Sequence, residues 1–225
     1  MTTVQHDLSK LWVLKYADSW AKVHVEPAFN GDVDAAFKLC AALGNDKRGH
    51  VAVAMWRAKV PPDAFRAYFS TAWDHDHRYV IGAAGTRRRL AYMFRYAAFA
   101  LPDRLPSVVR VWRGTSKLGL FQARTGYSWT TDRDVACWFA MRSAGSNGSP
   151  LVLRADILLS DISMWHDLRG EREAVLMKPP AVVAVDGEIE DWNNCYQRWE
   201  SEKREGERAA LRRAVATNKT RGGAK

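Results

Sequence analysis

The stretch VVRVWRGT, residues 108–115, is where the sequence changes character. Its β-branched and aromatic residues predict a strand that ends at Arg113-Gly114-Thr115. Helical patterns fill the hundred residues before it, and strand-like runs follow it at residues 126–131, 151–157, 173–177 and 181–185. Because helices and strands are segregated rather than alternating, the sequence predicts an α+β fold and argues against a doubly wound parallel sheet.

Several local signals predict where individual elements begin and end. An apolar stripe at steps of three and four predicts a first helix whose stripe is buried in a core: Leu8, Leu11, Trp12, Tyr16 and Trp20. Asp32 and Asp132 each stand where an Asp can cap a helix. Residues 160–170 are expected to form a connection, and a last helix is expected to run from Glu188 to about Thr217.

Composition limits the class of protein and its partners. The chain has 225 residues, a formal net charge of +9 and a pI of about 9.6, so a polyanion, an acidic protein or a phosphate-bearing ligand is a natural partner. Residues 201–225 contain eight Lys or Arg and three Glu. The three cysteines form no close pair, and Cys40 and Cys137 are expected to be buried thiols. No signal-peptide core or membrane-length apolar stretch is found, which favours a cytoplasmic protein.

Two carboxylates stand one residue apart in Glu171-Arg172-Glu173, directly before an apolar strand-like run. If the strand includes both, Glu171 and Glu173 project from one face, because side chains alternate along a strand. Two such charges raise each other's proton affinity unless a cation compensates, and a site that meets developing positive charge can use the pair. Alone, however, the pattern is more typical of a solvated strand end.

Three short motifs lie on separate strand-like segments of the second half of the chain. Arg113 closes the first strand, Ser128-Trp129-Thr130 lies on the next extended segment, and Glu171-Arg172-Glu173 opens a later one. In this order they resemble the signature of the R-S-E class of mono-ADP-ribosyltransferases, which has an arginine, a Ser-x-Ser/Thr element and a Glu/Gln-x-Glu pair. The middle Trp-Thr departs from the Thr-Ser of many members, although Thr130 keeps a hydroxyl. The resemblance covers residues 108–185.

The resemblance implies a fold and a division of the chain. The helical region expected at residues 1–104 lies outside the resemblance and would pack on a two-sheet, mainly antiparallel NAD-binding core of the ADP-ribosyltransferase type, which the resemblance implies at residues 105–200. Residues 201–225 are left as a basic tail. Members of the class often act as toxins or as effectors against host proteins, and bacteriophages encode several, so a location in a host cytoplasm also fits.

The resemblance also implies a role for each motif residue, with NAD as substrate and no metal. Glu173 would stabilise the oxocarbenium-like state at the ribose, and Glu171 would orient the incoming nucleophile and take its proton. Arg113 would hold the diphosphate, because its planar fork suits phosphate oxygens. Ser128 and Thr130 would brace Glu173 or the ribose. Gly114 and Phe139 belong to the expected NAD-binding set, although Tyr127, Trp138 and Phe139 are equal candidates for stacking on nicotinamide.

The expected activity is transfer of ADP-ribose from NAD to an arginine of a target protein, because a Glu at the first position of the pair is associated with arginine acceptors in the class. Trp165 and His166 could form the surface that meets the target, or could equally be ordinary loop packing. The alternatives are a nucleic-acid base or water as acceptor, or a basic nucleic-acid-binding or adaptor module without catalysis. Neither a membrane nor a metal is an expected partner: His75 and His77 have no partner cluster for a metal site.

Overall fold

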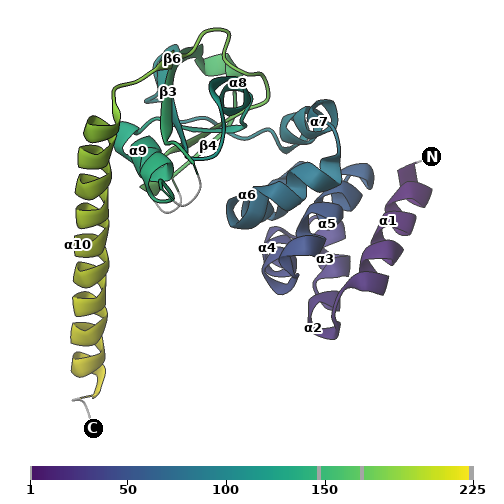
Figure 1. The fold of residues 1–225 in the computed structure, drawn as a ribbon. Coiled ribbons are helices and arrows are strands. Elements are labelled where there is room, and N and C mark those ends of the chain that lie inside the picture. The colour runs from purple at the N-terminus through teal and green to yellow at the C-terminus, as the bar shows by residue number, and fades with distance from the viewer. Residues whose placement is uncertain (1, 146–147, 168–169, 223–225) are drawn as a thin grey trace. The chain divides into compact units, whose positions relative to one another are not determined.

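The computed structural model describes residues 2–145, 148–167 and 170–222 (Figure 1). The helices are α1 (Thr2–Tyr16), α2 (Ser19–Lys22), α3 (Val25–Phe29), α4 (Val33–Ala42), α5 (Asn45–Arg57), α6 (Pro62–Ala84), α7 (Arg87–Ala97), α8 (Leu120–Arg124), α9 (Arg133–Met141) and α10 (Ile189–Gly222), with a short 3-10 helix, η1 (Leu159–Asp161). The strands are β1 (Val108–Thr115), β2 (Ser128–Thr130), β3 (Leu151–Leu158), β4 (Ile162–His166), β5 (Glu173–Leu176) and β6 (Ala184–Val185). The fold is α+β.

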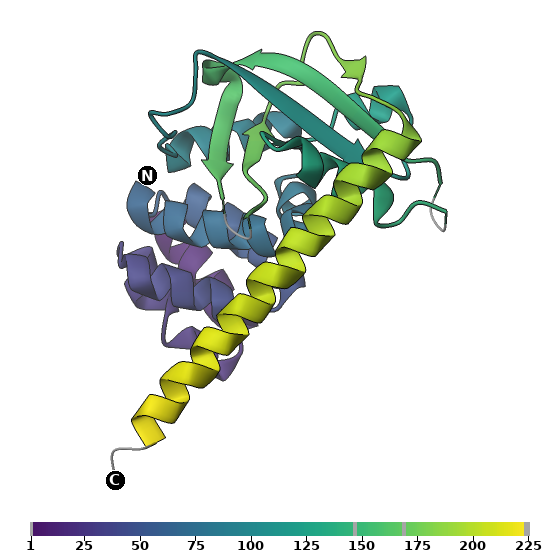
Figure 2. The ribbon, with the colours of Figure 1, turned by 90° about the vertical axis from the view of Figure 1, so that its left-hand side faces the viewer.

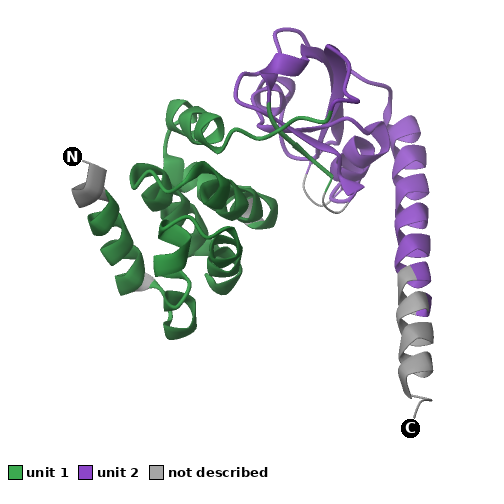
Figure 3. Cartoon of the chain, turned by 180° about the vertical axis from the view of Figure 1, so that it is seen from behind, with its two compact units in different colours: residues 1–102, 163–168 green, residues 103–162, 169–225 purple. Residues whose placement is uncertain are grey.

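The chain divides into two compact units (Figure 3). The helical unit comprises Met1–Pro102 together with Ser163–Leu168, and the sheet unit comprises Asp103–Ile162 together with Arg169–Lys225. The boundary expected from the sequence lies after residue 104.

The helical unit is built around α6, which packs against α4, α5 and α7. Aromatic side chains fill the space between α6 and α7, and all of them are buried or nearly so. The Phe69 ring lies 5.1 Å from that of Phe65 and 4.8 Å from that of Phe94, and Trp73 meets Phe94 edge-on at 5.0 Å. Offset and edge-on pairs of this kind stabilise a core beyond the area that they bury.

The apolar stripe predicted to bury α1 is in fact largely exposed. Leu8 and Leu11 are each 59% exposed and Trp12 is 40% exposed, whereas Val13 is buried. Trp20 lies in the separate helix α2 and is 61% exposed. The expected core stripe is therefore wrong, because α1 turns a narrower face inward than the spacing of its large residues indicates.

The capping predictions are confirmed at both sites. The Asp32 carboxylate accepts the Ala35 backbone N–H at 2.9 Å at the start of α4, and Asp132 accepts the Asp134 backbone N–H at 2.9 Å at the start of α9. The prediction of buried thiols is also confirmed: Cys40 and Cys137 are fully buried, and burial raises the pKa of Cys40 to about 12.

The described strands form one six-stranded sheet in the order β4-β5-β2-β1-β3-β6, rather than the two sheets implied by the resemblance. The pairs β1–β2, β1–β3, β2–β5 and β3–β6 are antiparallel. The longest ladder joins β1 to β3 over eight residue pairs, from Val108 with Leu158 to Thr115 with Leu151. β4 lies where the sequence analysis expects only a connection, so that expectation is wrong.

One side of the sheet unit is covered by α9, which packs against β1, and α10 packs against α9 in turn. The cluster between these elements is made of buried side chains: Ala136, Cys137, Ala140, Val152, Trp192 and Cys195. A Cβ built at Gly114 would overlap the carbonyl oxygen of Ala136, so α9 can approach β1 this closely only over a glycine. Figure 2 shows α10 as one continuous helix. It continues to Gly222, beyond the end expected near Thr217.

Candidate active site

Arg113 is a half-buried residue of β1, and its guanidinium is held in place by its neighbours. Its Nη1 donates a hydrogen bond to the carbonyl oxygen of Ser128, whereas its Nε is buried without a hydrogen-bond partner among the described residues. Burial lowers the pKa of Arg113, and the charge of the nearby Glu173 carboxylate opposes that effect. A Cβ built at Gly126 would overlap the guanidinium of Arg113, so the guanidinium can occupy this position only because residue 126 has no side chain.

The two hydroxyls of β2 have different surroundings. The Ser128 Oγ is buried and has no hydrogen-bond partner in the described part of the chain. The Thr130 Oγ1 donates to the carbonyl oxygen of Glu171 at 2.7 Å and accepts the Asp132 backbone N–H at 3.0 Å. Thr130 therefore fixes the backbone around the carboxylate pair, and Ser128 is the residue with an unfilled bonding position.

Glu173 is the first residue of β5 and pairs directly with Thr130 across the β2–β5 ladder. Residues that face each other in an antiparallel ladder project from the same side of the sheet. The carboxylate lies close enough to Arg113 for its charge to act on the guanidinium. Arg113, Ser128 and Glu173 thus stand on the three adjacent strands β1, β2 and β5. Because Trp112 is the residue that pairs with Thr130, the Arg113 side chain leaves β1 on the other side of the sheet. Its guanidinium reaches the backbone carbonyl of Ser128.

Glu171 does not share this strand. β5 begins at Glu173, and Arg172 has a φ of 45°, in the left-handed region that is unfavourable for a residue with a Cβ. The backbone carbonyl of Arg172 accepts the Thr131 backbone N–H at 3.1 Å. The guanidinium of Arg172 lies 3.3 Å from the Asp132 carboxylate. The expectation that strand alternation places the two glutamates on one face is therefore wrong, because the backbone turns between them.

Comparison with family models, curated proteins and solved structures gives no significant match.

Arg142 is a charged neighbour of the site that the sequence analysis missed. It follows α9, and its guanidinium lies 4.5 Å from the ring centres of both Trp138 and Phe139. Partial desolvation over these rings lowers the pKa of Arg142, and the charge of Glu171 opposes that effect. The charge of Glu173 thus acts on Arg113, and the charge of Glu171 acts on Arg142. The only sequence signal is the i, i+4 spacing from Trp138 to Arg142, which is common on any helix.

The remaining predicted residues have other surroundings. Phe139 packs edge-on against Trp138 at 5.0 Å, and Arg142 covers its ring. Residue 114 is a glycine because α9 packs too close to β1 there to leave room for a side chain. Trp165 and His166 are half-buried on β4, in the segment Ser163–Leu168 that groups with the helical unit. β4 is the neighbour of β5 in the sheet, so Trp165 and His166 lie on the strand next to the one that carries Glu173.

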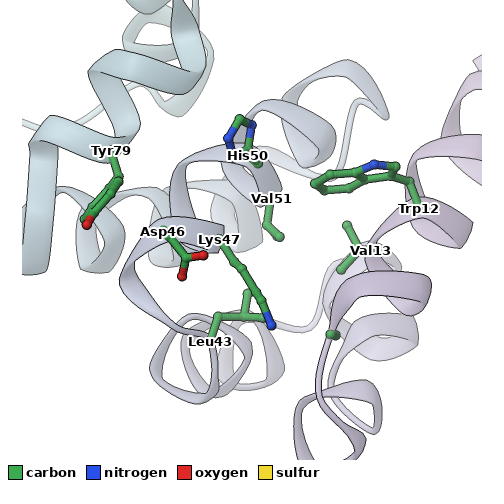
Figure 4. A pocket seen from close by; sticks show the side chains of 9 residues that line it. Trp12, Val13, Leu43, Asp46, Lys47, His50, Val51 and Tyr79 are labelled. Atoms are coloured by element: carbon green, nitrogen blue, oxygen red, sulfur yellow. The ribbon is translucent and has the colours of Figure 1, made fainter.

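The described residues contain no group of three or more His, Cys, Asp or Glu side chains arranged to hold a metal ion. No helix in these segments combines the length and apolar character needed to cross a bilayer. A hollow of about 410 Å³ lies within the helical unit, with Val13 and Val51 at its base and Trp12, His50 and Lys47 around it (Figure 4). None of the predicted site residues lines this hollow.

Proposed function

We propose that the chain is a mono-ADP-ribosyltransferase that transfers ADP-ribose from NAD to an arginine of a target protein and releases nicotinamide. One observation carries the proposal: Arg113, the buried Ser128 hydroxyl and Glu173 stand on the adjacent strands β1, β2 and β5, with Arg113 bonded to the Ser128 backbone and acted on by the charge of Glu173. They do so in the strand order of the R-S-E signature, although they are far apart in the sequence.

The unfilled bonding positions of the group fit NAD as a substrate. Buried polar atoms nearly always have partners in proteins, so a buried donor without one indicates a position that a ligand completes. The Arg113 Nε and the Ser128 Oγ are two such atoms within the described chain. A guanidinium held at Nη1 with a spare donor at Nε suits a diphosphate oxygen, and a hydroxyl on the same side of the sheet as Glu173 suits a ribose hydroxyl.

The reaction breaks the bond between C1′ of the ribose and the nicotinamide nitrogen, and the bonding electron pair leaves with nicotinamide. Positive charge then develops on the ribose, as in glycoside hydrolysis. Glu173 is fixed at the start of β5, where its negative charge stabilises that state without reorganisation. A nitrogen of the acceptor guanidinium forms the new bond to C1′, and its proton passes to Glu171.

The separation of the two glutamates supports different roles for them. Glu171 is half-buried outside β5, its charge acts on the exposed Arg142, and its backbone carbonyl accepts the Thr130 hydroxyl at 2.7 Å. We expect Glu171→Ala to reduce transfer to the acceptor far more than hydrolysis of NAD to ADP-ribose, because water is a small nucleophile that needs no such positioning. An equal loss of both reactions would contradict the role given to Glu171.

The test of the proposed function is incubation with NAD labelled in its adenosine part and a cell lysate, followed by separate protease and nuclease digestion. Label that enters macromolecules, is released by protease and resists nuclease is the expected result. Label that nuclease releases would show that the acceptor is a nucleic acid rather than a protein. Absence of label in macromolecules, with NAD left intact, would contradict the proposal. The matched control is Glu173→Gln, which keeps the shape of the side chain.

A further inference from the structure

The outer face of α7 carries cations and aromatic rings and no acidic residue. α7 buries Leu90, Met93 and Phe94 on one side. The opposite side presents Arg88 and Arg95, which lie one turn on either side of Tyr92. Their guanidinium groups are 5.7 and 4.6 Å from the centre of the Tyr92 ring, which is 40% exposed.

The same arrangement continues along the flank of α7. Tyr96 lies one turn after Tyr92, and the ammonium of Lys59, from the turn between α5 and α6, is 5.1 Å from its ring centre. Lys59 is also 5.4 Å from the ring of Trp56. We refer to these six residues as the α7 band: Trp56, Lys59, Arg88, Tyr92, Arg95 and Tyr96.

The cations of the α7 band are available to a partner. Arg88, Lys59 and Arg95 are exposed, and none of them forms an ion pair within the described part of the chain. Lys38 and Arg110, by contrast, are neutralised locally: Lys38 lies 2.6 Å from Asp34, and Arg110 lies 2.8 Å from Asp156. An exposed face with three unneutralised cations attracts a polyanion.

We propose that the α7 band binds single-stranded nucleic acid. Its cations would contact phosphate oxygens, and bases would stack on its aromatic rings and guanidinium planes. The rings decide between this partner and an acidic protein surface, because carboxylates need only the cations whereas bases also need flat surfaces. A duplex hides the faces of its bases, so single strands fit better. The proposal concerns the helical unit alone and does not depend on the activity proposed for the sheet unit.

The test uses the full chain and a fluorescein-labelled single-stranded RNA of 12 nucleotides and mixed sequence, with binding followed by fluorescence anisotropy across a salt series. Arg88→Ala with Arg95→Ala should weaken binding at least about tenfold. It should also reduce the slope of log K against log salt by about 1.4, because each phosphate that the protein no longer neutralises lowers the slope by about 0.7. The control Lys38→Ala with Arg110→Ala removes the same charge from neutralised positions. It should change the affinity less than about twofold.

The stacking part of the proposal has its own variant. Tyr92→Leu keeps every charge, and we expect it to weaken binding at least about fivefold without changing the salt slope. Circular dichroism should show parental helicity for all variants, because the substituted side chains lie on the outer face of their helix or strand. The proposal is overturned if the two double variants lose affinity equally, or if Tyr92→Leu binds like the parent. It is also overturned if polyglutamate of equal charge competes as well as unlabelled RNA.

Discussion

Replacing Gly126 by alanine tests the position of Arg113 without altering the arginine. A Cβ at residue 126 would overlap Cζ, Nε and Nη2 of Arg113, so the guanidinium would have to move away from its present position. In leaving, it would lose the hydrogen bond to the carbonyl of Ser128 and its position beside Glu173. The variant therefore separates the presence of an arginine from its placement.

The structure sets the size of the effect. A hydrogen bond to a charged group contributes about 1.5–3 kcal/mol, so we expect Gly126→Ala to lower the free energy of unfolding by about that amount. If Arg113 binds the diphosphate from its present position, Gly126→Ala also removes about 1.5–3 kcal/mol of binding energy from the transition state. That loss reduces kcat/KM for nicotinamide release about 10- to 150-fold.

Gly119→Ala is the matched control. A Cβ at Gly119 meets nothing within 4 Å, and the position has an ordinary negative φ of −67°. We expect this variant to match the parent in turnover and to be equally stable or more stable by up to about 1 kcal/mol, since alanine restricts the unfolded chain. Urea unfolding and nicotinamide release should be measured for both variants. Gly126→Ala with parental stability and parental turnover would refute the reasoning about Arg113.

Two further predictions concern the surroundings of the site. Thr130→Val removes a hydroxyl that bonds two backbone groups at 2.7 and 3.0 Å, and it should lower the free energy of unfolding by about 1–3 kcal/mol. The control is Thr131→Val, whose hydroxyl makes one contact at 3.5 Å, and it should change the free energy of unfolding by less than about 0.5 kcal/mol. Similar urea midpoints for the two variants would contradict this prediction. Hydrogen bonds from Arg198 lower the pKa of Asp134, so their stabilisation is present above about pH 4 and is lost as the pH falls through the lowered pKa. Arg198→Gln should therefore lower stability by up to about 1 kcal/mol at neutral pH and by less near about pH 2.5, and an equal effect at both would argue against the pair.

Local signals in the sequence predict the parts of the fold that depend on local physics. The caps at Asp32 and Asp132 follow from side chains that satisfy the free N–H groups of a helix end. The strands that carry Arg113, Ser128 and Glu173 follow from β-branched and apolar runs. Their convergence depends on strand order, β5-β2-β1, which periodicity does not encode.

The incorrect expectations have tertiary causes. The large side chains of α1 have helical spacing, but that spacing does not say which face meets the rest of the unit, and Leu8 and Leu11 remain exposed. Strand alternation fails before Glu173 because Arg172 adopts a positive φ, a conformation that no residue-type preference predicts for arginine. Arg142 was missed because its proximity to Glu171 joins two segments distant in the sequence.

Release of nicotinamide from NAD by the purified full chain tests the central claim most directly. We expect the parent to release nicotinamide, and Glu173→Gln to release it at least about 100-fold more slowly, because one preorganised charge at the developing cation is lost. A parent that leaves NAD intact, or a Glu173→Gln variant that matches the parent's rate, would contradict a reaction centred on Arg113, Ser128 and Glu173.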